Sequence, residues 1–267
     1  MNLSEYSKEI YNRYGVVTRA KNCFLYTKKD IRLTDLFLEN GRAILGWQGG
    51  AAFTYFKNNL SRGITGSYIT EDYPRVQKAT GELLDGPQKN NTRTRQIFYF
   101  SSRASAIKAA LLFSPENTSF YRPWSPEKIN WQDVDCVVLA PPLPWTDNLF
   151  ILAVKTSVSE VQTPADSEKI PFPLESAVAR SIYDLIEAQK IREEKDWFIY
   201  DPVLTKYWTR KGPYLYPKIP AEKYNDFVLH CLDCGICINP DYNNPSIVPY
   251  GADKGVFSKL KNSPFLF

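Results

Sequence analysis

Apolar residues along the chain alternate between helical spacing and short continuous runs. Helical spacing places Tyr6, Ile10 and Tyr14 on one face of residues 3–14. The same spacing predicts further helices over 51–60, 71–84, 106–113, 176–189 and 221–232. Apolar runs predict strands over 22–26, 30–33, 97–100, 134–139, 149–154 and 235–238. Strands and helices therefore alternate along most of the chain.

This alternation predicts an α/β fold. A run such as Leu149–Val154 is apolar at every position, which is typical of a strand in a sheet that is covered on both faces. The strand at 97–100 leads through a tight turn directly into a helix, as in α/β units. The last quarter of the chain is rich in Tyr and Pro and indicates a separate α+β lobe.

Composition and charge exclude several classes of protein. With 267 residues, 43% of them hydrophobic, the chain is long enough to bury a full core. Its 33 basic and 29 acidic residues nearly cancel to +4, which does not favour nucleic acid or an anionic membrane as a partner. The N-terminus is polar, and no run reaches the roughly 18 apolar residues of a membrane span. We expect a cytoplasmic protein.

Three of the five cysteines fall within seven residues, at Cys231, Cys234 and Cys237. An odd count with such crowding predicts reduced thiols rather than a disulfide framework. The spacing occurs at iron–sulfur sites, but a complete site needs a fourth ligand, and for zinc that ligand would be His230. The other interpretation is a packed joint between helix and strand, with Gly235 at the turn. Metal binding stays open as an alternative.

Four segments, in this order, resemble class III aminotransferases that depend on pyridoxal phosphate (PLP). They are the opening Arg19–Tyr26, continued by Asp30–Asp35 and Ile44–Trp47, then Ile97–Ala110, then Pro173–Ile186, and last Phe227–Pro240. The resemblance implies a PLP-transferase-like lobe with a mixed or parallel sheet and helices on both faces, over residues 50–186. It also implies a small α+β lobe built from 15–47 and 190–267, with residues 1–14 as an N-terminal helix.

The resemblance also implies where a cofactor site would lie. The turn Ser101-Ser102-Arg103-Ala104 matches the segment that holds the cofactor phosphate through backbone N–H groups at a helix N-terminus. The aromatic ring that stacks on the cofactor would come from Phe120 or Tyr121, with Tyr121 as the candidate site residue. Lys155, at the end of Asn148–Lys155, is the candidate for the lysine that forms the aldimine.

The departures from the family pattern are as informative as the matches. Arg103 stands where the family has glycine, no His-Gly pair follows Phe113, and the candidate strands end without the carboxylate that pairs with the pyridine nitrogen. We therefore predict a shortened and degenerate aminotransferase-like protein that acts as a partner or scaffold subunit without transaminase activity or bound PLP. The alternative is a divergent PLP-dependent aminotransferase that uses Lys155.

Aromatic residues near the first predicted large-lobe helix bear on assembly. Trp47, Tyr55 and Phe56 fall on the segment that, in the resembled family, lies against a second subunit. A two-fold homodimer would cover them most simply. The other arrangement is a heteromer in which a full-length aminotransferase-like chain takes the second place.

Overall fold

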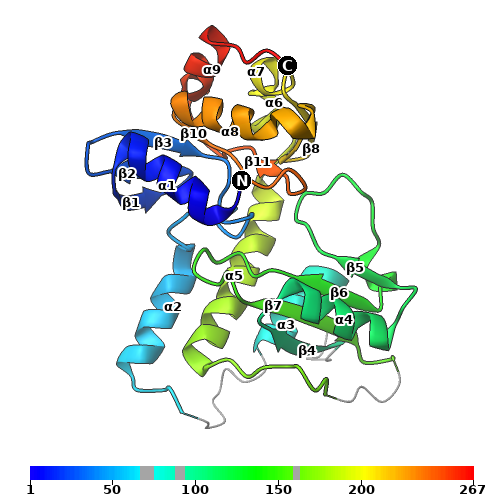
Figure 1. The fold of residues 1–267 in the computed structure, drawn as a ribbon. Helices are drawn as coiled ribbons and strands as arrows, with labels where there is room; N and C mark the ends of the chain where they lie inside the picture. The colour runs from blue at the N-terminus through cyan, green and yellow to red at the C-terminus, as the bar shows by residue number, and fades with distance from the viewer. Residues whose placement is uncertain (67–74, 88–93, 159–162) are drawn as a thin grey trace. The chain divides into compact units, whose positions relative to one another are not determined.

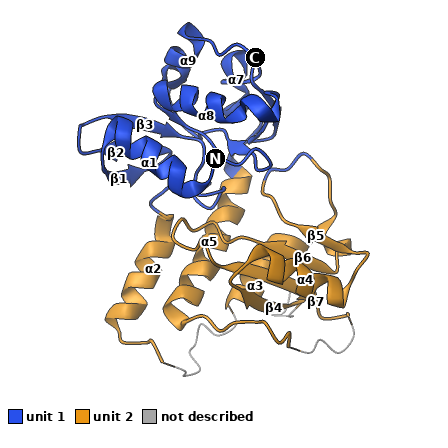
Figure 2. Ribbon diagram, in the orientation of Figure 1, with its two compact units in different colours: residues 1–48, 124–126, 191–267 blue, residues 49–123, 127–190 orange. Residues whose placement is uncertain are grey.

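The computed structural model describes residues 1–66, 75–87, 94–158 and 163–267 (Figure 1). The chain divides into two compact units (Figure 2). Unit 1 comprises residues 1–48, 124–126 and 191–267, and unit 2 comprises residues 49–123 and 127–190. Within the described ranges, no helix has the length and apolar character needed to cross a membrane.

Unit 1 begins with helix α1, Leu3–Tyr14, whose start is fixed by a capping box between Asn2 and Glu5. The next strands are β1 (Val17–Lys21), β2 (Phe24–Thr27) and β3 (Arg32–Asp35), which pair antiparallel in sequence order. From the far end of the chain, β10 (Ile236–Cys237) joins as the fourth strand, parallel to β3. Both ends of the chain therefore contribute to one sheet.

A second sheet in unit 1 has the order β11-β9-β8. Its strands are β8 (Trp208–Lys211), β9 (Tyr214–Pro217) and β11 (Ser246–Ile247). The helices of this half are α6 (Lys195–Phe198), α7 (Asp201–Leu204), α8 (Tyr224–Asp233) and α9 (Ser258–Asn262). Short 3₁₀ turns cover Ala221–Lys223 and Lys254–Phe257. Fully buried aromatic side chains fill the core of this unit, among them Trp208, Phe227 and Phe257.

A buried carboxylate closes the end of β3. The Oδ1 atom of Asp35 accepts hydrogen bonds from the backbone N–H groups of Phe37 and Leu38, at 2.9 and 3.1 Å. Its Oδ2 atom accepts one from the Trp47 indole at 2.8 Å. Burial raises the pKa of Asp35 to about 6, against the lowering effect of these bonds. Trp47 is thus tied to the sheet of unit 1 by its polar atom.

Unit 2 is built on a four-stranded sheet of order β4-β7-β6-β5. The strands are β4 (Arg95–Phe100), β5 (Thr118–Phe120), β6 (Cys136–Leu139) and β7 (Phe150–Lys155). Strand β7 is antiparallel to both of its neighbours, whereas β5 and β6 are parallel. Consequently β4, β5 and β6 all run in one direction and β7 runs in the other.

Helices complete unit 2. They are α2 (Gly50–Ser61), α3 (Arg75–Asp85), α4 (Arg103–Phe113) and α5 (Phe172–Ile191), with a 3₁₀ turn at Trp131–Asp133. Helix α4 lies on one face of the sheet and packs Ala106 and Ala110 against side chains of β4, β6 and β7 (Figure 1). Val137 and Ala153 are also fully buried although they point to the other face. Both faces of the sheet are covered.

The predicted fold class is confirmed, since a mixed sheet with covering helices and a smaller α+β part are both present. The part of the predicted helix 71–84 that covers residues 71–74 lies outside the described residues. Helix α4 begins at Arg103, three residues before the predicted start at Ala106. Sequence patterns also missed β1, whose side chains are almost all exposed, and the three-residue strand β5.

Candidate functional site

Three strands of unit 2 end at the same edge of the sheet. Because β4, β5 and β6 share a direction, their carboxyl ends lie together, and they are followed by Ser101, Tyr121 and Ala140 respectively. In open α/β sheets this edge is where ligands bind. We call it the carboxyl edge, and it holds the turn and the aromatic residue that the sequence predicted for a cofactor.

The turn after β4 works as a helix cap. Ser102 is the N-cap of α4, and its hydroxyl oxygen accepts the backbone N–H of Ser105 at 3.0 Å. The same hydroxyl donates to the Ser105 side chain at 2.9 Å. Ser101, Arg103 and Ala104 are exposed. The Ser102 hydroxyl is therefore engaged within the protein, in the alternative role that a Ser at this position can fill.

Two guanidinium groups lie near the carboxyl edge. Arg103 stacks over the ring of Phe120, with 4.4 Å from its Cζ to the ring centroid. Partial burial lowers the pKa of Arg103, and the nearby charge of Arg122 lowers it further. The edge is consequently positive around the start of α4, a charge that attracts anions.

Tyr121 faces into the protein instead of toward the edge. Its side chain is 6% exposed, and its hydroxyl accepts a hydrogen bond from Gln189 Nε2 at 2.9 Å. The ring packs against Trp131 with centroids 5.1 Å apart. Burial raises the pKa of Tyr121 to about 12. A ring packed in this way is not available to stack on a ligand, so the predicted stacking partner is accounted for by the core.

Lys155 lies at the opposite edge of the sheet. It ends β7, the strand that runs against the others, and its Cα pairs with that of Arg95 at the start of β4. Phe100 lies five steps of extended strand beyond Arg95, so the turn that follows Phe100 is about 17–20 Å away from Lys155. The structure does not bring Lys155 and Ser101–Ala104 together into one site.

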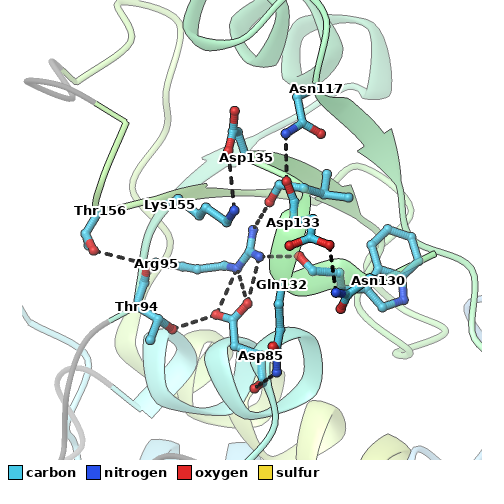
Figure 3. A network of polar contacts seen from close by, with 12 residues as sticks. Asp85, Thr94, Arg95, Asn117, Asn130, Gln132, Asp133, Asp135, Lys155 and Thr156 are labelled. Carbon is cyan, nitrogen blue, oxygen red and sulfur yellow. Dashed lines mark hydrogen bonds and ion pairs between the residues drawn. The ribbon is translucent and has the colours of Figure 1, made fainter.

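Lys155 pairs with Asp135 at the edge opposite the carboxyl edge, which we call the amino edge (Figure 3). Its Nζ lies 3.4 Å from Asp135 Oδ1, and its backbone N–H donates to the Asp135 carbonyl at 2.9 Å. The other carboxylate oxygen, Asp135 Oδ2, accepts from the Ser114 hydroxyl at 3.1 Å. The lysine thus behaves as one half of a partly exposed ion pair at the end of a strand.

Beside this pair lies a buried ion pair that the sequence did not predict (Figure 3). Arg95 has a fully buried side chain, and it contacts both carboxylate oxygens of Asp85 at 2.7–3.1 Å. It also donates to the carbonyls of Val134 and Trp131 at 3.0 and 2.7 Å. Thr94 Oγ1 donates to Asp85 at 2.7 Å. This set of contacts joins α3, β4 and the segment before β6, which is a structural arrangement.

The cysteine cluster lies in unit 1 at the end of α8. Cys231, Cys234 and Cys237 are buried free thiols, and burial raises the pKa of each. His230 Nε2 is 2.8 Å from the carbonyl oxygen of Ser263, so this ring holds the C-terminal segment. Across the described ranges, no three His, Cys, Asp or Glu side chains are arranged to hold a metal ion. The packed joint accounts for these cysteines.

The chain resembles solved aminotransferases in fold. Superposition on an acetylornithine aminotransferase from Elizabethkingia anophelis gives a TM-score of 0.67 at 13% identity, covering 98% of each chain. An ornithine aminotransferase from Toxoplasma gondii gives 0.66 at 10% identity, covering 98% of this chain and 96% of the other. Identities this low show a shared fold and nothing finer.

Two proteins resemble the chain in sequence along most of its length. An uncharacterised protein of Treponema pallidum is 25% identical, with 92% of this chain and 93% of the relative covered. A second uncharacterised protein, from Borreliella burgdorferi, is 23% identical over 97% of this chain and 94% of its own length. No protein-family model matches the chain.

The residues that the sequence predicted for PLP do not form one site. The phosphate and the aldehyde carbon belong to one small molecule, whereas Ser101–Ala104 and Lys155 lie at opposite edges of the sheet. Strand β6 is followed by Ala140, Pro141 and Pro142, whose side chains supply neither an amine nor a carboxylate. We derive no catalytic step through this cofactor.

Proposed function

We propose that this protein is an aminotransferase-fold subunit that does not transaminate and that serves as a partner or scaffold. The observation that supports this most directly is the separation of Lys155 from the turn Ser101–Ala104 by the length of β4 and β7. An aldimine lysine acts only on a carbonyl within bonding distance, and effective catalysis depends on such placement. Lys155 instead pairs with Asp135.

A protein without a PLP site should not retain the cofactor. Purified protein incubated with excess PLP and then desalted should be colourless, and Lys155→Met should behave in the same way. Retention of PLP near one equivalent per chain, abolished by Lys155→Met, would instead support a divergent PLP enzyme. Retention in both proteins would place the cofactor on some other lysine and would also contradict the proposal.

The surface of α2 supports a role in assembly. Of its twelve residues only Ala52 and Asn59 are buried, so the helix is poorly covered within one chain. Phe53 is 53% exposed and meets Trp145, itself 39% exposed, at 6.0 Å between centroids. Phe56 lies 6.3 Å from the same ring. We define the α2 patch as the side chains of Phe53, Phe56, Leu60 and Trp145. Tyr55 lies on a different face of α2, where the Arg180 guanidinium is 5.9 Å from its ring.

The α2 patch is the surface that we assign to self-association. Contiguous apolar surface of this kind marks protein contacts more often than it stays solvated, and a two-fold axis lets one patch cover its own copy. Trp47 is not part of this patch, because its indole N–H donates to Asp35. We propose a homodimer, with a heteromer that includes an aminotransferase-like chain as the other arrangement.

Light scattering on the protein alone tests this assignment. The protein should be dimeric at micromolar concentration, and Phe53→Asp should give monomers because a buried charge at the patch is costly. The control is Leu112→Asp on α4, a side chain 79% exposed and outside the patch, which should leave the dimer intact. A monomeric wild-type protein would reject the homodimer and favour the heteromer.

A further inference from the structure

Three residues of unit 1 come from the middle of the sequence of unit 2. Residues 124–126 belong to unit 1, whereas residues 49–123 and 127–190 on either side belong to unit 2 (Figure 2). We call Trp124–Pro126 the strap. It begins four residues after the end of β5.

Trp197 and Arg192 hold the strap in place in unit 1, and we call these two side chains its seat. The Trp124 ring meets Trp197 edge-on with 5.8 Å between centroids. The Arg192 guanidinium lies 5.2 Å from the Trp124 ring and 4.0 Å from that of Tyr250. Arg192 is itself fixed by donating to the Ile44 carbonyl at 2.7 Å. Cation–π and edge-to-face contacts of this kind are favourable but modest.

Several features weaken the binding of the strap to its seat. Trp124 has a φ of 57°, the left-handed conformation that costs a bulky residue free energy. Its indole Nε1 is buried and has no hydrogen-bond acceptor in the part of the chain that the structure describes. Within that same part, no backbone–backbone hydrogen bond involves residues 124–126. Favourable ring contacts are therefore set against backbone strain and a buried donor at the same residue.

The seat also depends on one glycine. Gly212, at φ +56°, approaches the strap so closely that a Cβ there would lie 2.3 Å from the Trp124 carbonyl oxygen. Real Cβ atoms do not tolerate this distance, and the opposing atom is backbone. A side chain at position 212 therefore requires the strap or the turn that contains Gly212 to shift. Substitution of Gly212 is therefore a specific way to weaken the contact between the strap and its seat.

We propose that the strap is a releasable latch, which exchanges between its seat on Trp197 and Arg192 and a released position. Strain and a buried donor at functional segments are typical of elements with two states. Release frees Trp124–Pro126 from their contacts in unit 1. This inference stands whether or not the protein binds PLP, because it rests on contacts within unit 1.

Fluorine NMR on the full chain labelled with 5-fluorotryptophan tests the latch. The six tryptophans give six signals, and Trp124→Phe identifies the signal of interest by its loss. In wild-type protein, saturation transfer should connect the seated Trp124 signal to a minor signal with a solvent isotope shift. In Gly212→Ala the released population should rise by about tenfold or more.

Gly235→Ala is the matched control. Gly235 has φ +79° in the same unit but nothing within 4 Å of an added Cβ, so alanine there introduces backbone strain away from the contacts of the strap. It should leave the Trp124 signal unchanged. The latch is rejected if Gly212→Ala and Gly235→Ala give the same Trp124 signal. It is also rejected if wild-type protein shows no minor signal, a test that holds even where Gly212→Ala fails to fold.

Discussion

Replacing Arg95 by methionine should destabilise unit 2 far more than the same change at Lys155. The two residues are direct partners in the β4–β7 register, so they occupy one place in the sheet. Arg95 is fully buried on Asp85, whereas Lys155 and Asp135 have side chains that are 21% and 29% exposed. Methionine keeps an unbranched apolar chain of similar length and so limits the loss of packing.

The magnitudes follow from burial. Removing Arg95 leaves the Asp85 carboxylate in a largely dry site, with one donor fewer for the Trp131 and Val134 carbonyls. Removing one partner of a buried pair costs about 3–5 kcal/mol. A partly exposed pair such as Lys155 and Asp135 contributes about 1 kcal/mol or less. We expect the two substitutions to differ by at least about 2 kcal/mol.

Urea unfolding followed by circular dichroism measures the difference. Arg95→Met should lower the midpoint by about 1 M or more at an unchanged m-value, and Lys155→Met should leave it nearly in place. Adding Asp85→Asn to Arg95→Met should cost less than the sum of the single changes, because the stranded charge is removed. Equal midpoints for Arg95→Met and Lys155→Met would refute the assignment of the buried network as structural.

Other predictions concern single groups. Asp35 has a folded pKa raised to about 6, so its contribution to stability is present below about pH 4 and is lost as pH rises through 6. Asp35→Asn should remove that slope, of up to about 3 kcal/mol, from urea midpoints measured between pH 4 and 7; an unaltered slope would contradict the raised pKa. Ser102→Ala should cost about 1 kcal/mol through loss of the α4 cap, and an unchanged urea midpoint would argue against the capping role. Buried thiols such as Cys231 and Cys237 should react with a thiol reagent only on unfolding, and fast labelling of native protein would contradict their burial.

Sequence patterns predicted the main elements because burial leaves a plain local signal. The apolar run at 149–154 is such a case, since Ile151 to Val154 are all fully buried in β7. Its direction was not predicted, although the sequence held the information. Residues 140–149 between β6 and β7 are too few for the crossover of a dozen or more residues that parallel strands require. Strand β7 must therefore run antiparallel to β6. This direction places Lys155, at the end of β7, at the amino edge.

The candidate site was harder to predict than the fold. Local similarity proposed Lys155 and Ser101–Ala104 separately, but whether they meet depends on strand direction, which a motif does not contain. Arg95 was missed because a charged residue at the start of a strand normally indicates exposure. Its burial depends on Asp85, ten residues earlier and on another element. Contacts of this kind are decided by packing and leave no periodic signal.

Reductive trapping shows whether Lys155 forms an aldimine with PLP. The full-length protein is incubated with a stoichiometric amount of PLP, reduced with borohydride and digested, and the pyridoxyl group is located by mass spectrometry. We expect scattered, substoichiometric labelling of exposed lysines, with Lys155 labelled no more than the rest. Stoichiometric labelling at Lys155 alone would contradict it, because that result requires a bound cofactor at a residue that the fold places away from the carboxyl edge.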